Sequence, residues 1–96
     1  HLLKLEGIST VLVFGMTEDR IHISARTKDI RINIGDIISR AFGDIGSAGG
    51  HQRTAAAQIQ LGIFMGVKDK NLLLKLADEA VRRRFLGTLG VDEEQT

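Results

Sequence analysis

The chain has 96 residues, 43% of them hydrophobic, which is enough for one compact domain with a single core and too short for two. Its 13 Lys and Arg against 12 Asp and Glu leave a net charge of +1, which excludes a protein that coats DNA through a global positive field. The absence of cysteine excludes disulfides and thiolate zinc sites, and the apolar runs are too short to cross a bilayer. We therefore expect a soluble cytoplasmic domain with no membrane partner.

The first third of the chain predicts a hairpin. Residues 2–6 have the composition of a short helical fragment. Residues 9–16 are β-branched and apolar on both faces, which is typical of a central strand covered on two sides. After a polar turn, residues 20–26 alternate strictly between polar and apolar, so we expect them to form the second arm of the hairpin.

The remaining segments predict two helices and one more strand. Asn33 is a suitable N-cap for an amphipathic helix over 34–42, and Gly43 is expected to end it. Residues 58–64 alternate again and predict a third strand, and a second helix is expected over about 71–86. The order strand, strand, helix, glycine loop, strand, helix predicts an α/β fold with helices packed on a small mixed β-sheet.

Arg84 is an exception on the second helix, since it falls near the middle of its apolar arc. We expect it to extend outward and to complement the negative end of the helix dipole, an interpretation favoured over a ligand contact.

A glycine-rich segment over 46–54 carries the strongest functional signal. Four of the eight residues from 43 to 50 are glycine, so this backbone can adopt positive φ and bring its N–H groups close to a ligand. His51 and Arg53 follow at once. N–H donors, an imidazole and a guanidinium on one short segment favour a phosphate or nucleotide site. The alternative is a loose turn with a solvated histidine.

The polar face of the second strand is a second candidate. Arg20, His22, Ser24 and Arg26 form a row with neighbours about 7 Å apart, a spacing that can follow a short phosphate backbone. A solvent-facing strand gives the same alternation, and for Arg20 we favour that interpretation. For Arg26 we favour binding, because it lies at the far end of the strand, where ligands gather in α/β folds.

The sequence lacks the motifs that several classes of enzyme require. There is no nucleophile elbow, no Walker motif and no dinucleotide-binding glycine fingerprint. His22 and His51 have no acidic neighbours at a spacing that suits a metal. The chain is therefore not expected to be a catalyst by itself.

Two motifs in the expected order resemble a known family. One is Ile23-Ser24-Ala25-Arg26, and the other is Gly49-Gly50-His51 followed by Ala55-Ala56. They resemble the Ser-x-Arg segment and the Gly-Gly-Gly-His loop of the C-terminal substrate-binding domain that accompanies the DHH phosphoesterase core. That superfamily contains RecJ-like exonucleases, oligoribonucleases and cyclic-dinucleotide phosphodiesterases. The resemblance covers about residues 8–64.

The resemblance implies a division of labour between two domains. Residues 1–96 would be a single substrate-binding domain, excised from the C-terminal part of a larger phosphoesterase. Hydrolysis would belong to the catalytic domain of the same chain, whose Asp-His-His motif binds manganese; that motif is absent here and this fragment is expected to need no cofactor of its own. The expected ligand is a short single-stranded nucleic acid or a nucleotide. The expected substrate- and phosphate-binding residues are Ser24, Arg26, Gly49, Gly50, His51 and Arg53.

Two other functions stay open at this point. The chain could be a stand-alone module that binds single-stranded nucleic acid, or a dimerisation domain. Phe64 is kept as a candidate stacking platform for a base, although packing in the core is favoured. The sequence does not choose among single-stranded DNA, an oligoribonucleotide, 3′-phosphoadenosine 5′-phosphate and a cyclic dinucleotide.

Overall fold

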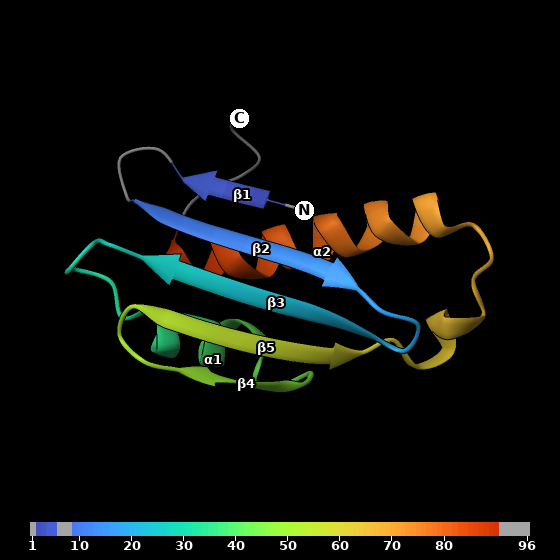
Figure 1. Cartoon of the computed structure of the whole chain (residues 1–96), viewed down its shortest axis with the longest axis horizontal. Coiled ribbons are helices and arrows are strands. Elements are labelled where there is room, and N and C mark those ends of the chain that lie inside the picture. Colours follow the sequence, from blue (N-terminus) through green and yellow to red (C-terminus); the bar gives the residue numbers. More distant parts are fainter. Residues whose placement is uncertain (1, 6–8, 91–96) are drawn as a thin grey trace.

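One sheet and two helices make up the part of the chain that the computed structural model describes, residues 2–5 and 9–90 (Figure 1). The sheet has the strand order β1-β2-β3-β5-β4, and every neighbouring pair in it is antiparallel. In chain order the elements are β1 (Leu2–Leu5), β2 (Thr10–Met16), β3 (Arg20–Thr27), α1 (Ile34–Phe42), β4 (Ser47–Gly50), β5 (Thr54–Gln60), the 3-10 helix η1 (Gly62–Gly66) and α2 (Lys70–Leu89).

The predicted α/β class is confirmed, with two corrections to the sheet. It is antiparallel in all its described pairings, whereas a mixed sheet was expected. Leu2–Leu5 is a strand paired with β2, where a helical fragment was expected. Pairing with a neighbouring strand overrides the weak helix preference of four residues. Glu6, the last residue of that expected fragment, lies outside the described residues.

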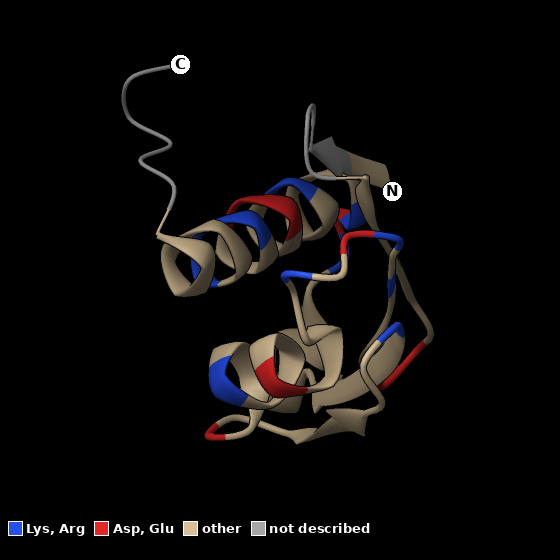
Figure 2. Cartoon of the chain, turned by 90° about the vertical axis from the view of Figure 1, so that its left-hand side faces the viewer, with Lys and Arg blue, Asp and Glu red and all other residues tan. Residues whose placement is uncertain are grey.

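Both helices cover the same face of the sheet, so β2 is covered on one side only (Figures 1 and 2). Leu12 and Phe14 point into the core, while Val13 between them is 46% exposed. The expectation that this strand is covered on both faces is therefore wrong. The opposite face of the sheet, called the open face below, carries the polar row of β3.

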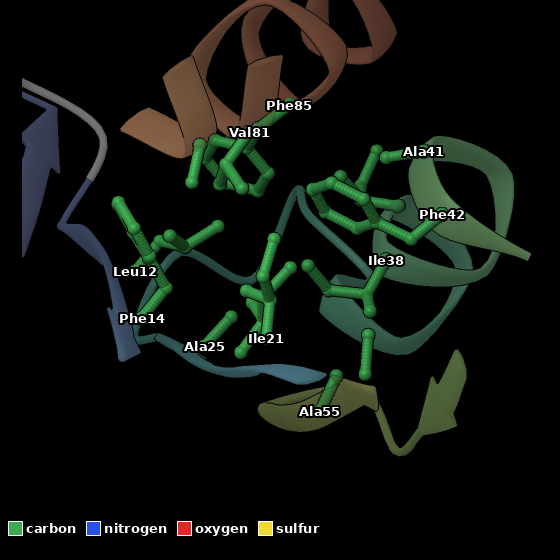
Figure 3. Close-up of a cluster of buried hydrophobic side chains, with 14 of the residues drawn as sticks. Leu12, Phe14, Ile21, Ala25, Ile38, Ala41, Phe42, Ala55, Val81 and Phe85 are labelled. Atoms are coloured by element: carbon green, nitrogen blue, oxygen red, sulfur yellow. The ribbon is translucent and has the colours of Figure 1, made fainter. Parts of the chain in front are cut away.

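The core lies between the sheet and the two helices (Figure 3). Alternate residues of β2, β3 and β5 meet one stripe from each helix, because a strand repeats every two residues and a helix every 3.6. The side chains labelled in Figure 3 are Leu12, Phe14, Ile21, Ala25, Ile38, Ala41, Phe42, Ala55, Val81 and Phe85.

The glycine segment is more ordered than expected. Residues 47–50 form the edge strand β4, and β5 begins at Thr54 and ends at Gln60, where a strand over 58–64 was expected. Gly62 has a φ of +59°, which turns the chain into η1. Ile63 is consequently 89% exposed and does not lie on a strand face.

Both predicted helices are present. The Asn33 side chain accepts a hydrogen bond from Asp36 N at 3.1 Å and so caps α1, as expected. α2 begins after an Asp69 cap and ends at Gly90, whose φ of +82° is the left-handed conformation that favours glycine. Among the described residues, neither helix combines the length and hydropathy needed to cross a membrane.

Arg84 complements a helix end, but the helix is α1 and not its own. Its Nη1 donates to Ala41 O at 2.9 Å, in the last turn of α1, and to Asp44 Oδ1 at 2.8 Å. The guanidinium therefore satisfies a carbonyl at the negative end of the α1 dipole. This contact joins the two helices at their surface.

Replacing Arg84 by alanine is expected to lower the free energy of unfolding by about 1–2 kcal/mol, because a charged hydrogen bond to a helix end is lost. Arg40→Ala is the matched control, since it removes only the exposed ion pair with Asp36 and should cost less than about 0.5 kcal/mol. Urea unfolding of both variants measures the difference. Equal losses would contradict the assignment of Arg84 as a helix-joining residue.

Candidate functional site

The predicted binding residues lie on elements that meet at one end of the sheet, where β2 begins, β3 ends and a tight turn joins β4 to β5 (Figure 1). Arg26 lies opposite Val11 on one side and Thr54 on the other. Thr27 N donates to Arg53 O at 3.0 Å, so the end of β3 and the turn are tied together. Residues 27 positions apart in sequence, Arg26 and Arg53, thus reach the same end of the fold.

Two adjoining hollows occupy this end. The first has a volume of about 600 Å³, and its lining residues are Ser9, Val11, Arg26, Thr27, Lys28, Arg53 and Thr54. The second has a volume of about 510 Å³, and its lining residues are Asn33, Gly50, His51, Gln52, Arg53 and Thr54. Because Arg53 and Thr54 line both, a ligand that entered one hollow could extend into the other. We call the two together the cationic hollow.

The other two predicted residues lie beside this hollow on the open face. Ser24 is one strand repeat before Arg26 and points the same way. It pairs with Ala56, which in turn pairs with Gly49. Ser24, Ala56 and Gly49 form a row across three strands and have only small side chains or none. We call this row the low strip, because the surface is lower there than at long side chains such as Arg26. All six predicted residues therefore share one region of the surface.

Ion pairing separates the arginines of this chain into two groups. Six of them pair with a carboxylate within 4 Å: Arg20, Arg31, Arg40, Arg82, Arg83 and Arg84. Within the described residues, Arg26 and Arg53 have no ion pair and no side-chain hydrogen bond. These two guanidinium groups line the same hollow. They are therefore available to an anion from outside the chain.

The polar row of β3 divides along its length. At its start, Arg20 donates to both carboxylate oxygens of Asp19 and to Gln58 Oε1. The bond from Arg20 holds the pKa of Asp19 below its usual range. His22 Nε2 lies 3.3 Å from the Thr17 hydroxyl. The start of the row is thus engaged in local contacts, which agrees with the solvent-facing interpretation preferred for Arg20.

The carboxylate of Asp29, in the loop that follows β3, is bound by an arginine of the same loop. Asp29 accepts from Arg31 Nη2 at 2.7 Å, from Arg31 Nε at 2.9 Å and from Arg31 N at 2.9 Å. The side-chain hydrogen bond from Arg31, followed by the one from its backbone, lowers the pKa of Asp29 from 3.8 to about 2. Because Arg31 balances this carboxylate, it does not cancel the charge of Arg26 and Arg53.

This pKa shift predicts a pH dependence of stability. A carboxyl whose pKa is lower in the folded state stabilises the fold above its unfolded pKa and loses that contribution as the pH falls. The contribution of Asp29 should be complete above about pH 4 and should vanish as the pH falls through about 2. Asp29→Asn should therefore be less stable than the wild type at pH 6, and the difference should shrink between pH 4 and 2. Urea unfolding across that range checks this, and a constant difference would contradict it.

The backbone of the β4–β5 turn is held by α1. His51 N donates to Thr54 O at 2.7 Å and closes the turn. His51 O accepts from Gly35 N at 2.8 Å, and Gln52 O accepts from Ile34 N at 3.0 Å. The first N–H groups of α1 are therefore used to position the turn and do not face a ligand. The His51 and Arg53 side chains project from a backbone that is fixed at both ends.

The glycine segment was expected to offer backbone N–H donors to a ligand, and such a donor can be located at the outer edge of β4. Because His51 and Thr54 form a hydrogen-bonded pair, alternation makes Gly50 and Ala55 a pair without hydrogen bonds. The N–H of Gly50 thus points away from β5, along the outer edge of the sheet. No glycine of the segment has positive φ, since among the described glycines only Gly62 and Gly90 do.

Close packing explains the glycines of this region better than backbone conformation does. A Cβ on Gly50 would lie 2.5 Å from Ala55 Cα and from Thr54 O. A Cβ on Gly35 would lie 2.8 Å from Gly50 C and from His51 O. Gly35 was missed by the sequence analysis, although a glycine in the first turn of an amphipathic helix is a signal for close packing. A Cβ on Gly49 would meet nothing within 4 Å, so the fold does not require this glycine.

Phe64, the candidate stacking platform, lies far from the cationic hollow. Leu61 N donates to Asp19 O, which places the chain leading into η1 beside the β2–β3 turn, at the opposite end of β3 from Arg26. The Phe64 ring is half exposed and does not belong to the buried core. Within the described residues, no group of three or more His, Asp or Glu side chains could hold a metal ion.

Comparisons with known proteins assign the chain to a family. Residues 1–83 match the model of the DHHA1 domain. The chain is 56% identical over 94 residues to the uncharacterized protein MJ1633 of Methanocaldococcus jannaschii, an alignment that covers 98% of this chain and 19% of that protein. It thus spans about a fifth of the length of the curated relative it matches. No solved structure matches it. The chain belongs to the DHHA1 domain family, which is associated with DHH phosphoesterases.

Proposed function

We propose that this domain binds the phosphate-bearing end of a short single-stranded nucleic acid or of a nucleotide, and presents it to a DHH catalytic domain of the same protein. The observation that carries the proposal is the pair Arg26 and Arg53. They are the arginines without an acidic partner among the described residues, and both line one hollow with Lys28. Unpaired guanidinium groups are suited to phosphate because their donors match its oxygens in pairs.

The surrounding residues would have distinct roles. Arg26 and Arg53 would hold phosphate oxygens, and Lys28 would add a third positive charge at the rim. His51, whose side chain is exposed at the neighbouring hollow, would donate to the ligand or help to close the active site against the catalytic domain. The low strip of Ser24, Ala56 and Gly49 would accommodate a ribose or a base, because it has no long side chains.

Hydrolysis would take place on the catalytic domain. The sequence contains no Asp-His-His motif, and the donor groups of the described residues do not fit a manganese site. The metal expected for a DHH phosphoesterase would accordingly be bound by the other domain. The contribution of this chain would be to orient the substrate, which lowers the entropic part of the barrier without any chemistry of its own.

The decisive experiment is an NMR titration of the chain with a 5′-phosphorylated diadenylate, followed through backbone amide shifts. Shifts are expected in residues 24–28 and 49–54, and the same dinucleotide without its 5′-phosphate should bind at least about tenfold more weakly. Equal binding of the two dinucleotides, or no shift at millimolar ligand, would contradict the proposal.

The same titration with oligonucleotides of increasing length distinguishes this proposal from the alternative of a stand-alone module that binds single-stranded nucleic acid. The unpaired cations at the cationic hollow could neutralise only a few phosphates, so affinity should level off after two or three nucleotides. A strand of about twelve nucleotides that bound far more tightly, with a steep salt dependence, would favour a module that binds single-stranded nucleic acid.

A further inference from the structure

Two buried polar side chains at the site end of the sheet have no part in the function proposed above. Thr10, at the start of β2, and Thr27, at the end of β3, are the polar residues buried among the described part of the chain, at 0% and 4% exposure. They face the helix-covered side of the sheet, directly behind the strand ends that carry Arg26. Burying a hydroxyl is costly unless it is hydrogen-bonded. The hydrogen bonds of these two side chains therefore show which segments of the chain they connect.

Thr27 contacts three segments that form the first hollow. Its Oγ1 lies 2.9 Å from Thr10 Oγ1 in β2 and accepts from Asp29 N at 3.1 Å, in the loop that follows β3. Its backbone N donates to Arg53 O at 3.0 Å, in the β4–β5 turn. One buried residue thus connects the strand, the loop and the turn on which Ser9, Lys28 and Arg53 are carried.

We propose that Thr27 is a positioning residue for the phosphate site, and that its hydroxyl holds the loop over 28–31 in the place where Lys28 lines the first hollow. This inference rests on the proposed function for its ligand, but its structural part does not. Among the described residues, a change of the Thr27 side chain removes one anchor of that loop, the hydrogen bond from Asp29 N to Thr27 Oγ1. The bonds from Thr27 N to Arg53 O and from Lys28 N to Ser9 O join backbone atoms and would remain.

The comparison of Thr27→Val with Thr10→Val isolates this hydroxyl. Both variants remove the bond between the two threonines, and both replace a buried hydroxyl by a methyl group of similar size. Only Thr27→Val also removes the acceptor of Asp29 N. The two variants therefore lose similar packing, and the loss of the Asp29 N acceptor belongs to Thr27→Val alone.

The expected result is a separation of stability from binding. At a similar loss of thermal stability, Thr27→Val should weaken the binding of 5′-phosphorylated diadenylate about tenfold, and Thr10→Val less than about twofold. Thr27→Ser keeps the hydroxyl and should restore binding, even if it is less stable than the wild type. Equal weakening in both valine variants, or a Thr27→Ser variant that binds as poorly as Thr27→Val, would overturn the proposal.

A measurement without ligand keeps this inference separate from the proposed function. The amide of Asp29 should exchange with solvent about tenfold faster in Thr27→Val than in Thr10→Val, because it has lost its acceptor. Unchanged exchange at Asp29 would reject the positioning role even if the dinucleotide binds. Faster exchange together with no dinucleotide binding by the wild type would instead reject the proposed function and keep the anchor.

Discussion

Replacing Arg26 by glutamine is expected to weaken the binding of 5′-phosphorylated diadenylate by about ten- to a hundredfold, which corresponds to the loss of about 1.5–3 kcal/mol from a charged hydrogen bond. Arg20→Gln is the matched control. Arg20 lies on the same strand and the same face, but its guanidinium is already bound by Asp19 and Gln58. Its replacement should change the dissociation constant by less than about twofold.

Isothermal titration calorimetry at two salt concentrations measures both effects. Each phosphate contact that is lost reduces the slope of log K against log salt by about 0.7 for a single strand. Arg26→Gln should therefore bind more weakly and with a shallower salt dependence, whereas Arg20→Gln should keep the slope of the wild type. If the two variants weaken binding equally, the ion-pair distinction between these arginines does not locate the site, and the phosphate lies elsewhere on the open face.

The elements predicted best are those whose pattern depends only on nearby residues. The alternation of β3 and the stripe of α1 follow from side-chain periods within one segment, and both agree with the structure. The strands β1 and β4 were missed because four residues carry little pattern of their own. Leu2–Leu5 and Ser47–Gly50 become strands through pairing with β2 and β5, and this pairing depends on residues distant in sequence.

In the candidate site, too, local sequence patterns were predictive, whereas contacts between distant residues were not. Motif order places Arg26 and the Gly49-Gly50-His51 segment at element ends, and the structure brings these ends together. Sequence could not show which arginine is free, because the pairing of Arg20 with Gln58 crosses two strands that lie 38 residues apart in the chain. It also could not show that α1 fixes the turn, since that contact depends on Gly35 meeting the His51 carbonyl.

Gly50→Ala is expected to lower the free energy of unfolding by about 3 kcal/mol, the upper end of the range for inserting a methyl group into a packed region. The new Cβ would lie 2.5 Å from Ala55 Cα and from Thr54 O and 2.6 Å from Ala55 Cβ. Two of these three atoms belong to backbone, so the clash is relieved only if β4 and β5 move apart. Urea unfolding measures the loss.

Gly49→Ala is the matched control, and it separates the two glycines by function. Its Cβ would meet nothing within 4 Å and its φ is not positive, so stability should change by less than about 0.5 kcal/mol. A side chain there would nevertheless rise from the low strip beside Ser24 and Ala56, where the proposed function places a ribose or base. Gly49→Val should thus weaken the binding of 5′-phosphorylated diadenylate, and urea unfolding of the same variant checks that its fold is intact. The structure explains by packing why residue 50 must be glycine, but it gives no packing reason for glycine at residue 49. A role in binding would supply that reason. A Gly49→Val variant that binds normally would therefore show that the ligand does not use the low strip.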